Sequence, residues 1–440
     1  MSHQLPKRQR ANNGSEDIFS KLPESLISRI LSLLSTKDAF RTSVLSKKWR
    51  HRWTCITKLV MDDSDFYSRK KTKQCFLNFM YRILLLTKWE SFSLVIGANK
   101  YDASLVNAWI SSILHRTVRN LCIKSKLELS FSALTSHFLF NCRSLEELVL
   151  EMTLCAVVVP SIFLYFGQLK FLKLSGITFT HEDPNYSESL KLHFPVLKKF
   201  ETINCTWSFS KGITVDAPLL ESVLINQYPK SLPYKPNMCA IKFSAPKLKN
   251  FTYHVDGHIS PDVVLLDRSS AHNASANITL YICNDRVAET GNCIILLLKQ
   301  LNQVLAKSRL DILHSFVMLS HLELGLVTCE VLLGLLLKSP VLKTMVFKGL
   351  SKFDQELLNS ASVPDCFVST LQMVKIGRVH GYDHELCFAK FVMENGLVLE
   401  RLNFGALPYN LKAIEEFKEK LFSFKKGFKS YAIVDFSYGY

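Results

Sequence analysis

A short apolar phrase that recurs along most of the chain limits its possible folds more than any other feature. The phrase reads apolar-x-x-apolar-x-apolar, and its clearest copies begin at Leu145, Leu169, Leu197, Leu220, Leu248, Leu319, Leu342, Leu371 and Leu399. Weaker copies begin at Trp89, Val118, Asn277 and Phe428. Most neighbouring copies are 23 to 29 residues apart. A recurring period of this length indicates a repeat architecture.

The last two apolar positions of the phrase alternate, which predicts a short strand with one buried face. Segments between copies carry helical patterns, for example over residues 105–113 and 294–305. Residues 213–220 and 241–248 instead share an alternating pattern followed by Ala-Pro, which predicts a second extended segment. One such unit cannot bury its own core, so stacked copies are expected, with parallel strands lining a curved solenoid. The period is typical of leucine-rich repeats, and the predicted fold class is α/β.

The residues between the repeat leucines are candidates for a recognition surface. They alternate in charge and are rich in lysine: Glu146, Glu147, Val149, Lys170, Phe171, Lys173, Lys198, Lys199, Glu201, Glu221, Ser222, Lys249, Asn250 and Thr252. This row suits a protein partner, and it equally fits a solvated face. The substrate-binding residues are therefore unknown at this stage.

The stretch before the repeats, residues 17–53, has a helical pattern. Pro23 suits the first turn of a helix, and apolar residues recur at helical spacing over residues 26–34. A second short helix follows, and a third carries Trp49 and Trp53 on one face. A module this small buries its apolar surface poorly. It is either a subdomain packed on the rest of the chain or half of an interface.

The order of residues in this module closely resembles the plant F-box: Leu-Pro, Leu, Ile-Leu, a short turn, Val-Leu-Ser-Lys-Lys-Trp and a second Trp. It departs from the common pattern at His51-Arg52. The resemblance implies docking on a small acidic Skp-type adaptor, which links the module to a cullin ubiquitin ligase. Carried over position by position, the adaptor-binding residues are Leu22, Pro23, Leu26, Ile30, Leu31, Val44, Leu45, Trp49 and Trp53.

The positive charge of the chain is concentrated near this module. The formal net charge is +16, and residues 1–90 hold 18 basic and 8 acidic side chains, against 36 and 30 in the remaining chain. A basic module steers toward an acidic partner. The nearly even balance beyond residue 90 argues against nucleic acid as the ligand of the repeats. Asp62, Asp63 and Asp65 form an acidic run that we expect to be a solvated turn.

The C-terminal segment resembles the FBD region that ends many plant F-box/leucine-rich-repeat proteins. The similar features are a Pro-x-Cys lead at Pro364, a helix over residues 385–395 stopped by Gly396, and the strand Val398–Phe404. A last helix over residues 411–424 and a strand over 431–436 follow. The resemblance implies a strand–helix–strand unit that caps the solenoid.

No enzymatic motif, metal site or membrane span is expected. The chain has no P-loop, G-x-G-x-x-G, G-x-S-x-G or H-E-x-x-H sequence, and its 12 cysteines lack C-x-x-C spacing. His380, Asp383, His384 and Glu385 form one loop cluster, which we interpret as solvated. No apolar run approaches the roughly 18–20 residues of a membrane span. No catalytic residue and no cofactor is therefore assigned.

These inferences give four segments: a disordered basic tail (1–15), an F-box of three helices (16–60), the solenoid (61–360) and an FBD-like region (361–440). The resemblance implies a non-catalytic substrate-recognition subunit of a Skp–cullin–F-box ubiquitin ligase. Its partners would be the adaptor, through it the cullin, and an unknown target protein, in the cytoplasm or nucleus. The alternative is a basic solenoid that binds nucleic acid or a phosphorylated ligand without ligase function.

Overall fold

A computed structural model of the chain describes residues 22–44, 49, 52–66, 73–86, 89–98, 100–159, 163–181, 189–209, 212–228, 240–256, 263–266, 275–281, 319–327, 329–350, 358, 362–406, 411–425 and 432–438. The expected tail (1–15), Leu45 and the expected helix over residues 294–305 lie outside these residues. The fold is α/β and is dominated by one large parallel sheet.

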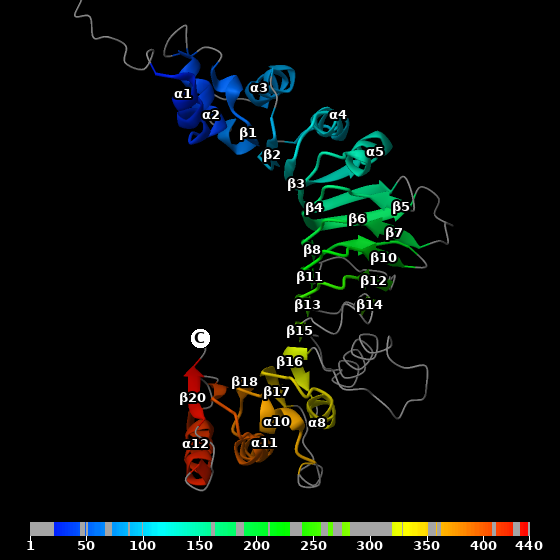
Figure 1. Cartoon of the computed structure of the whole chain (residues 1–440). Helices are drawn as coiled ribbons and strands as arrows, with labels where there is room; N and C mark the ends of the chain where they lie inside the picture. The colour runs from blue at the N-terminus through cyan, green and yellow to red at the C-terminus, as the bar shows by residue number, and fades with distance from the viewer. Residues whose placement is uncertain are drawn as a thin grey trace, which may run out of the picture.

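Within the described residues the large sheet has 15 strands, and the order of all of them except β9 follows the sequence. Its strands are β1 (Lys58–Asp62), β2 (Ser91–Ile96), β3 (Asn120–Phe131), β4 (Glu147–Val159), β6 (Phe171–His181), β8 (Lys199–Ile203), β11 (Ser222–Gln227), β13 (Asn250–Asp256), β15 (Ser275–Tyr281), β16 (Leu319–Val327), β17 (Thr344–Leu350), β18 (Met373–Val379), β19 (Arg401–Ala406) and β20 (Ile433–Tyr438), and β9 (Thr206–Trp207) pairs with β6. The strands stack along an arc, and the sheet lies on the inner side of the arc (Figure 1).

The repeat leucines form the core, as their spacing predicts. Leu148 of β4 pairs with Leu172 of β6, which pairs with Phe200 of β8, and all three side chains are buried. The same ladder continues through Val223 and Phe251. Each strand thus adds one apolar side chain to a column that runs across the sheet. Each of these side chains is covered by the equivalent side chains of the strands on either side.

The structure contradicts the predicted register of two weak copies of the phrase. In β15 the buried positions are Ala276 and Ile278, because Ile278 pairs with Tyr253. A copy that began at Asn277 would be out of this register. In β20 the inward positions are Val434 and Phe436, since Phe436 pairs with Phe404, so the copy does not begin at Phe428. Pairing with the neighbouring strand decides the register in both cases.

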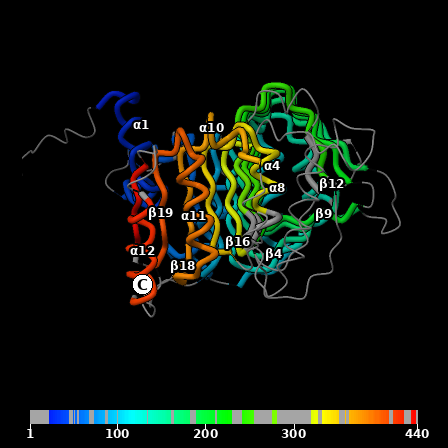
Figure 2. The backbone as a smooth tube through the Cα atoms, turned by 90° about the horizontal axis from the view of Figure 1, so that it is seen from below, coloured from blue at the N-terminus to red at the C-terminus, as the bar shows by residue number. Residues whose placement is uncertain are grey.

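The outer side of the arc changes from helices to strands and back to helices. Its helices are α3 (Lys73–Leu86), α4 (Ala103–Leu114), α5 (Ala133–Asn141), α8 (Cys329–Leu337), α10 (Asp365–Ser369), α11 (Asp383–Asn395) and α12 (Leu411–Lys425). A second parallel sheet of five strands replaces them in the middle, in the order β14 (Val263–Leu266), β12 (Ala240–Ser244), β10 (Ile213–Asp216), β7 (Leu190–His193) and β5 (Phe163–Tyr165). It lies on the side away from both ends of the described chain (Figure 2).

The predicted second extended segment is confirmed by β10 and β12, which pair from Ile213–Ile241 onward. The helices expected over residues 105–113, 385–395 and 411–424 are also confirmed, as α4, α11 and α12. The strands expected to be short are longer in the first repeats, where β3, β4 and β6 have 12, 13 and 11 residues. Helix α3 and strand β1 were not anticipated.

Candidate adaptor-binding site

The predicted site residues on helix α1 (Glu24–Ser32) divide between two faces of that helix. Ile27 and Leu31 point into the chain and are 1% and 0% exposed. Leu26, Ile30 and Leu33 lie four and three residues apart, on one face, and are 47%, 39% and 81% exposed. Pro23 precedes the helix as its N-cap and is also exposed. The helix therefore presents an apolar strip to solvent, which we name the α1 strip (Leu26, Ile30 and Leu33).

The two tryptophans belong to the interior. Trp49 and Trp53 are 3% and 4% exposed. The Trp53 ring packs edge-on against the Phe40 ring, with 5.2 Å between the ring centroids. The Phe40 ring packs in turn against Phe79 of α3, with 4.8 Å between the centroids. Trp49, Trp53 and Leu31 are thus enclosed by the core of the chain itself in this conformation. They were predicted to contact the adaptor, and the structure buries all three side chains, so they are not accessible to a partner in this conformation.

The third helix of the module is not confirmed. Its described residues form two 3-10 turns, Thr42–Val44 and Arg52–Cys55. Val44 stands at the end of the first turn and is 84% exposed. Leu22 is half-buried against the core.

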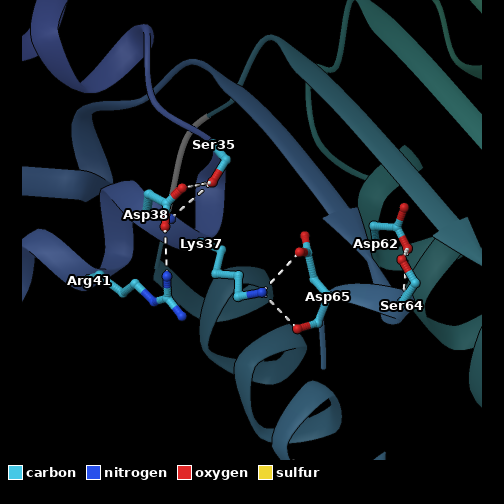
Figure 3. A network of polar contacts seen from close by, with 7 residues as sticks. All are labelled: Ser35, Lys37, Asp38, Arg41, Asp62, Ser64 and Asp65. Carbon is cyan, nitrogen blue, oxygen red and sulfur yellow. Dashed lines mark hydrogen bonds and ion pairs between the residues drawn. The ribbon is translucent and has the colours of Figure 1, made fainter. Parts of the chain in front are cut away.

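A polar network holds helix α2 (Thr36–Arg41) against the first repeat (Figure 3). The Lys37 Nζ donates to the carboxylate of Asp65 at 2.9 Å and to its backbone carbonyl at 2.8 Å. The backbone N–H of Val60 in β1 donates to the Thr36 hydroxyl at 2.8 Å. Ser35 caps the helix by accepting the N–H of Asp38 at 3.1 Å. The module is therefore joined to the first repeat by hydrogen bonds as well as by the contact of the Phe40 ring with Phe79.

The acidic run after the module is not the solvated turn that we expected. Asp63 is 1% exposed, and its carboxylate accepts the backbone N–H groups of Gly97 and Ala98 at 3.0 Å. Asp65 pairs with Lys37. Only Asp62 behaves as a local turn residue, accepting the N–H and hydroxyl of Ser64. Backbone donors 34 residues away decided the role of Asp63, so the local pattern could not reveal it.

Charge on the module is only partly compensated within the described residues. The Arg52 guanidinium pairs with Glu24 at 2.7 Å and so ties the second 3-10 turn to α1. Arg29 at the end of α1 and Lys58 at the start of β1 remain exposed. Positive side chains beside an exposed apolar strip favour an acidic partner with an apolar groove.

The lysines of the strand face are largely paired with acids, and two of these pairs join the residues directly before adjacent strands. Glu146 pairs with Lys170 at 2.6 Å, and Glu221 pairs with Lys249 at 2.8 Å. In each case the lysine hydrogen bond holds the pKa of the glutamate below its ordinary value. Such exposed pairs contribute little stability. They do neutralise the face, which weakens any attraction to a polyanion.

The histidine cluster near residue 380 has a structural role. The fully buried carboxylate of Glu385 accepts the backbone N–H groups of His380, Gly381 and Tyr382 at 2.9–3.2 Å. It thereby satisfies donors that precede the first turn of α11. Among the described residues, no group of three or more His, Cys, Asp or Glu side chains is placed to hold a metal ion. None of the described helices is both long and apolar enough to span a membrane.

Two family models match the ends of the chain. The model described as F-box domain matches residues 19–56, and the model described as FBD matches residues 359–404. The first match contains the α1 strip and both buried tryptophans. The second begins before α10 and ends within β19.

Relatives from Arabidopsis thaliana cover most of the chain. An F-box/LRR-repeat protein is 30% identical over 370 residues, which are 77% of this chain and 93% of that protein. An F-box/FBD/LRR-repeat protein is 27% identical over 412 residues, 89% of each chain. A second F-box/FBD/LRR-repeat protein is 27% identical over 428 residues, 90% of this chain and 91% of its own length.

Proposed function

The chain belongs to the plant family of F-box/FBD/LRR-repeat proteins, and from this premise we propose that it is a substrate-recruiting subunit of a Skp–cullin–F-box ubiquitin ligase. The F-box module would bind the Skp-type adaptor, and the solenoid would hold a target protein. The chain would contribute proximity, because a bound target has a high effective concentration near the ubiquitin-charged enzyme.

The observation that carries this proposal is the exposed α1 strip. Large aliphatic side chains gathered on one exposed helix face mark an interaction site, since leaving them in water has a hydrophobic cost of about 25 cal/mol per Å². We propose that the adaptor contacts the strip together with Leu22, Pro23 and Val44. Leu45, which lies outside the described residues, stays a predicted contact. Leu31, Trp49 and Trp53 would support this surface from beneath.

Adaptor binding by the purified full-length chain tests the proposal. The double variant Leu26→Glu/Leu33→Glu places two charges on the strip and leaves the buried face of α1 intact. It should weaken binding to a purified plant Skp adaptor by about 100-fold, as for central interface residues. Isothermal titration calorimetry measures the change.

Leu134→Glu is the matched control, because Leu134 is 60% exposed on α5, outside the module. It should bind the adaptor as the wild type does. Equal adaptor affinity of the double variant and the wild type would refute the assigned interface. Co-purification of a cullin with the wild-type complex then separates a ligase subunit from a scaffold that binds the adaptor alone.

The FBD-like end has a proposed structural role. Strand β20 is the last strand of the large sheet, and α12 precedes it. The centroid of the Phe404 ring in β19 lies 4.9 Å from the ring centroid of Phe436 in β20 and 5.4 Å from that of Phe417 in α12. We propose that residues 361–440 cap the solenoid by covering the apolar end of its last repeats.

A further inference from the structure

A hollow opens on the inner face of the first repeats, over strands β2, β3, β4, β6 and β8. Its volume is about 490 Å³, and its lining includes Lys124, Lys126, Glu151, Met152, Lys173 and Ile203. We name this hollow the lysine pocket. Its volume falls within the range of about 300–1,000 Å³ that is usual for binding sites. The pocket does not overlap the α1 strip.

Irregular pairing of the strands coincides with the pocket. The register of β3 on β4 shifts after Ser125, and that of β4 on β6 shifts after Glu151. In the next strand, Gly176 has a φ of +66°, and an added Cβ would lie 1.9 Å from the Met152 carbonyl oxygen. These irregularities lie in three adjacent strands, next to residues that line the pocket. Bulges of this kind are over-represented beside functional sites.

The charges in the pocket do not cancel. Its lining holds three lysines and one glutamate. The two oxygens of Glu151 accept Lys124 at 2.6 Å and Lys173 at 2.7 Å. Lys126 forms no ion pair in the part of the chain that the structure describes, and its stem lies over Gly97. Burial raises the pKa of Glu151, but the two lysine hydrogen bonds outweigh it, so the carboxylate stays ionised between them.

This arrangement differs from the rest of the inner face. Lys249 pairs with Glu221, and Lys170 and Arg119 both pair with Glu146. In the pocket two lysines share Glu151, and a third, Lys126, forms no ion pair among the described residues. An incoming anion would therefore meet ammonium groups that are already held in place. Apolar side chains, including Met152 and Ile203, line the same hollow.

We infer that the lysine pocket binds an acidic side chain, either a carboxylate or a phosphate, presented with a neighbouring apolar side chain by a segment of the target protein. Three ammonium groups supply charge-assisted hydrogen bonds to such an anion. A phosphate would match the excess charge most closely, since it carries about −1.5 to −2. The inference rests on the proposed function, because the segment is taken to belong to a target.

Oriented peptide libraries test the inference without knowledge of the target. Three libraries of random peptides share a fixed central residue: glutamate, phosphoserine or glutamine. The full-length wild-type chain should retain the glutamate or phosphoserine library about tenfold more strongly than the glutamine library. The ratio of the two acidic libraries tells which anion the pocket prefers. Equal retention of all three would overturn the inference.

Two variants assign any preference to the pocket. Lys126→Glu should abolish it, and Glu151→Gln should strengthen it several-fold, since the competing carboxylate is removed. Lys242→Glu carries the same charge change on β12 of the outer sheet and should retain the preference. A preference that survives Lys126→Glu, or is lost equally in Lys242→Glu, would also overturn the inference.

The adaptor titration is repeated on each variant. Wild-type affinity for the adaptor in Lys126→Glu and Glu151→Gln shows that the F-box module is intact, and an unchanged tryptophan fluorescence transition in urea shows that the repeats around the pocket are folded. A chain that binds the adaptor but shows no acidic preference refutes the lysine pocket alone. A wild-type chain that fails to bind the adaptor refutes the proposed function instead.

Discussion

At the scale of single residues, the strands beside the lysine pocket include two left-handed backbone conformations. Gly176 has a φ of +66°, and Asn204 has a φ of +52°. Ser175 pairs with Ile203, so the two residues occupy equivalent places in β6 and directly after β8. Asparagine tolerates this conformation better than most residues. Gly176 has no substitute, because the Met152 carbonyl occupies the place of a Cβ.

Gly176→Ala should therefore lower the free energy of unfolding by about 2 kcal/mol or more, through the positive φ and the contact with Met152. Thermal denaturation followed by circular dichroism measures the loss. Gly334→Ala in α8 is the matched control, because nothing lies within 4 Å of its added Cβ. It should leave stability unchanged or raise it by up to about 1 kcal/mol. Equal midpoints for Gly176→Ala and the wild type would contradict the expectation.

At the scale of elements, the F-box module is held to the first repeat by both rings and hydrogen bonds. Phe40 of α2 lies between Trp53 and Phe79, and Lys37 reaches Asp65. The Lys37 ammonium also lies 5.9 Å from the Phe66 ring centre. A module fixed in this way would present the α1 strip in a defined direction relative to the solenoid.

Phe40→Ala should loosen this junction. It removes the ring between α2 and α3, which should cost about 2 kcal/mol because Phe40 is only partly buried. Hydrogen exchange should become faster in α2 and α3 and remain unchanged in β11 and β13. Val44→Ala, on the same module but 84% exposed, should change stability by less than about 0.5 kcal/mol. Unchanged exchange in α2 would show that the hydrogen bonds alone hold the module.

At the scale of the whole molecule, the structure is a stack in which each strand of the large sheet except β9 pairs with its sequence neighbours in that sheet. Stability in such a stack is approximately a sum of repeat and neighbour contributions. The two ends should therefore unfold with little influence on one another. All five tryptophans lie between residues 49 and 207, so their fluorescence reports on the first half alone.

Phe404→Ala tests this independence. Phe404 is fully buried in β19, and its truncation should cost about 3–5 kcal/mol locally. In urea, the circular dichroism transition should gain an early phase, while the tryptophan transition keeps its midpoint. Phe200→Ala in β8 is the matched variant and should shift the tryptophan transition. A parallel shift of both signals in Phe404→Ala would indicate a single cooperative unit.

The sequence by itself determined the α/β repeat fold, the core columns and the family. Its apolar spacing encodes local geometry directly: Leu148 and Leu150 alternate because they lie on a strand, and the spacing in residues 26–34 indicates a helix. The outer strands β10 and β12 followed from a repeated pattern for the same reason.

Only the tertiary structure decided which apolar residues of α1 are exposed, since Leu26 and Ile27 look alike in sequence but Leu26 is exposed and Ile27 is buried. It also decided the register of β15, the burial of Asp63 and the lysine pocket. Each of these depends on atoms far away in the chain: Tyr253 for Ile278, Gly97 for Asp63, and Met152 for Gly176. A local sequence pattern predicts which side chains lie on the same face of a helix or strand. Only the tertiary packing determines whether that face is buried and which residues it contacts.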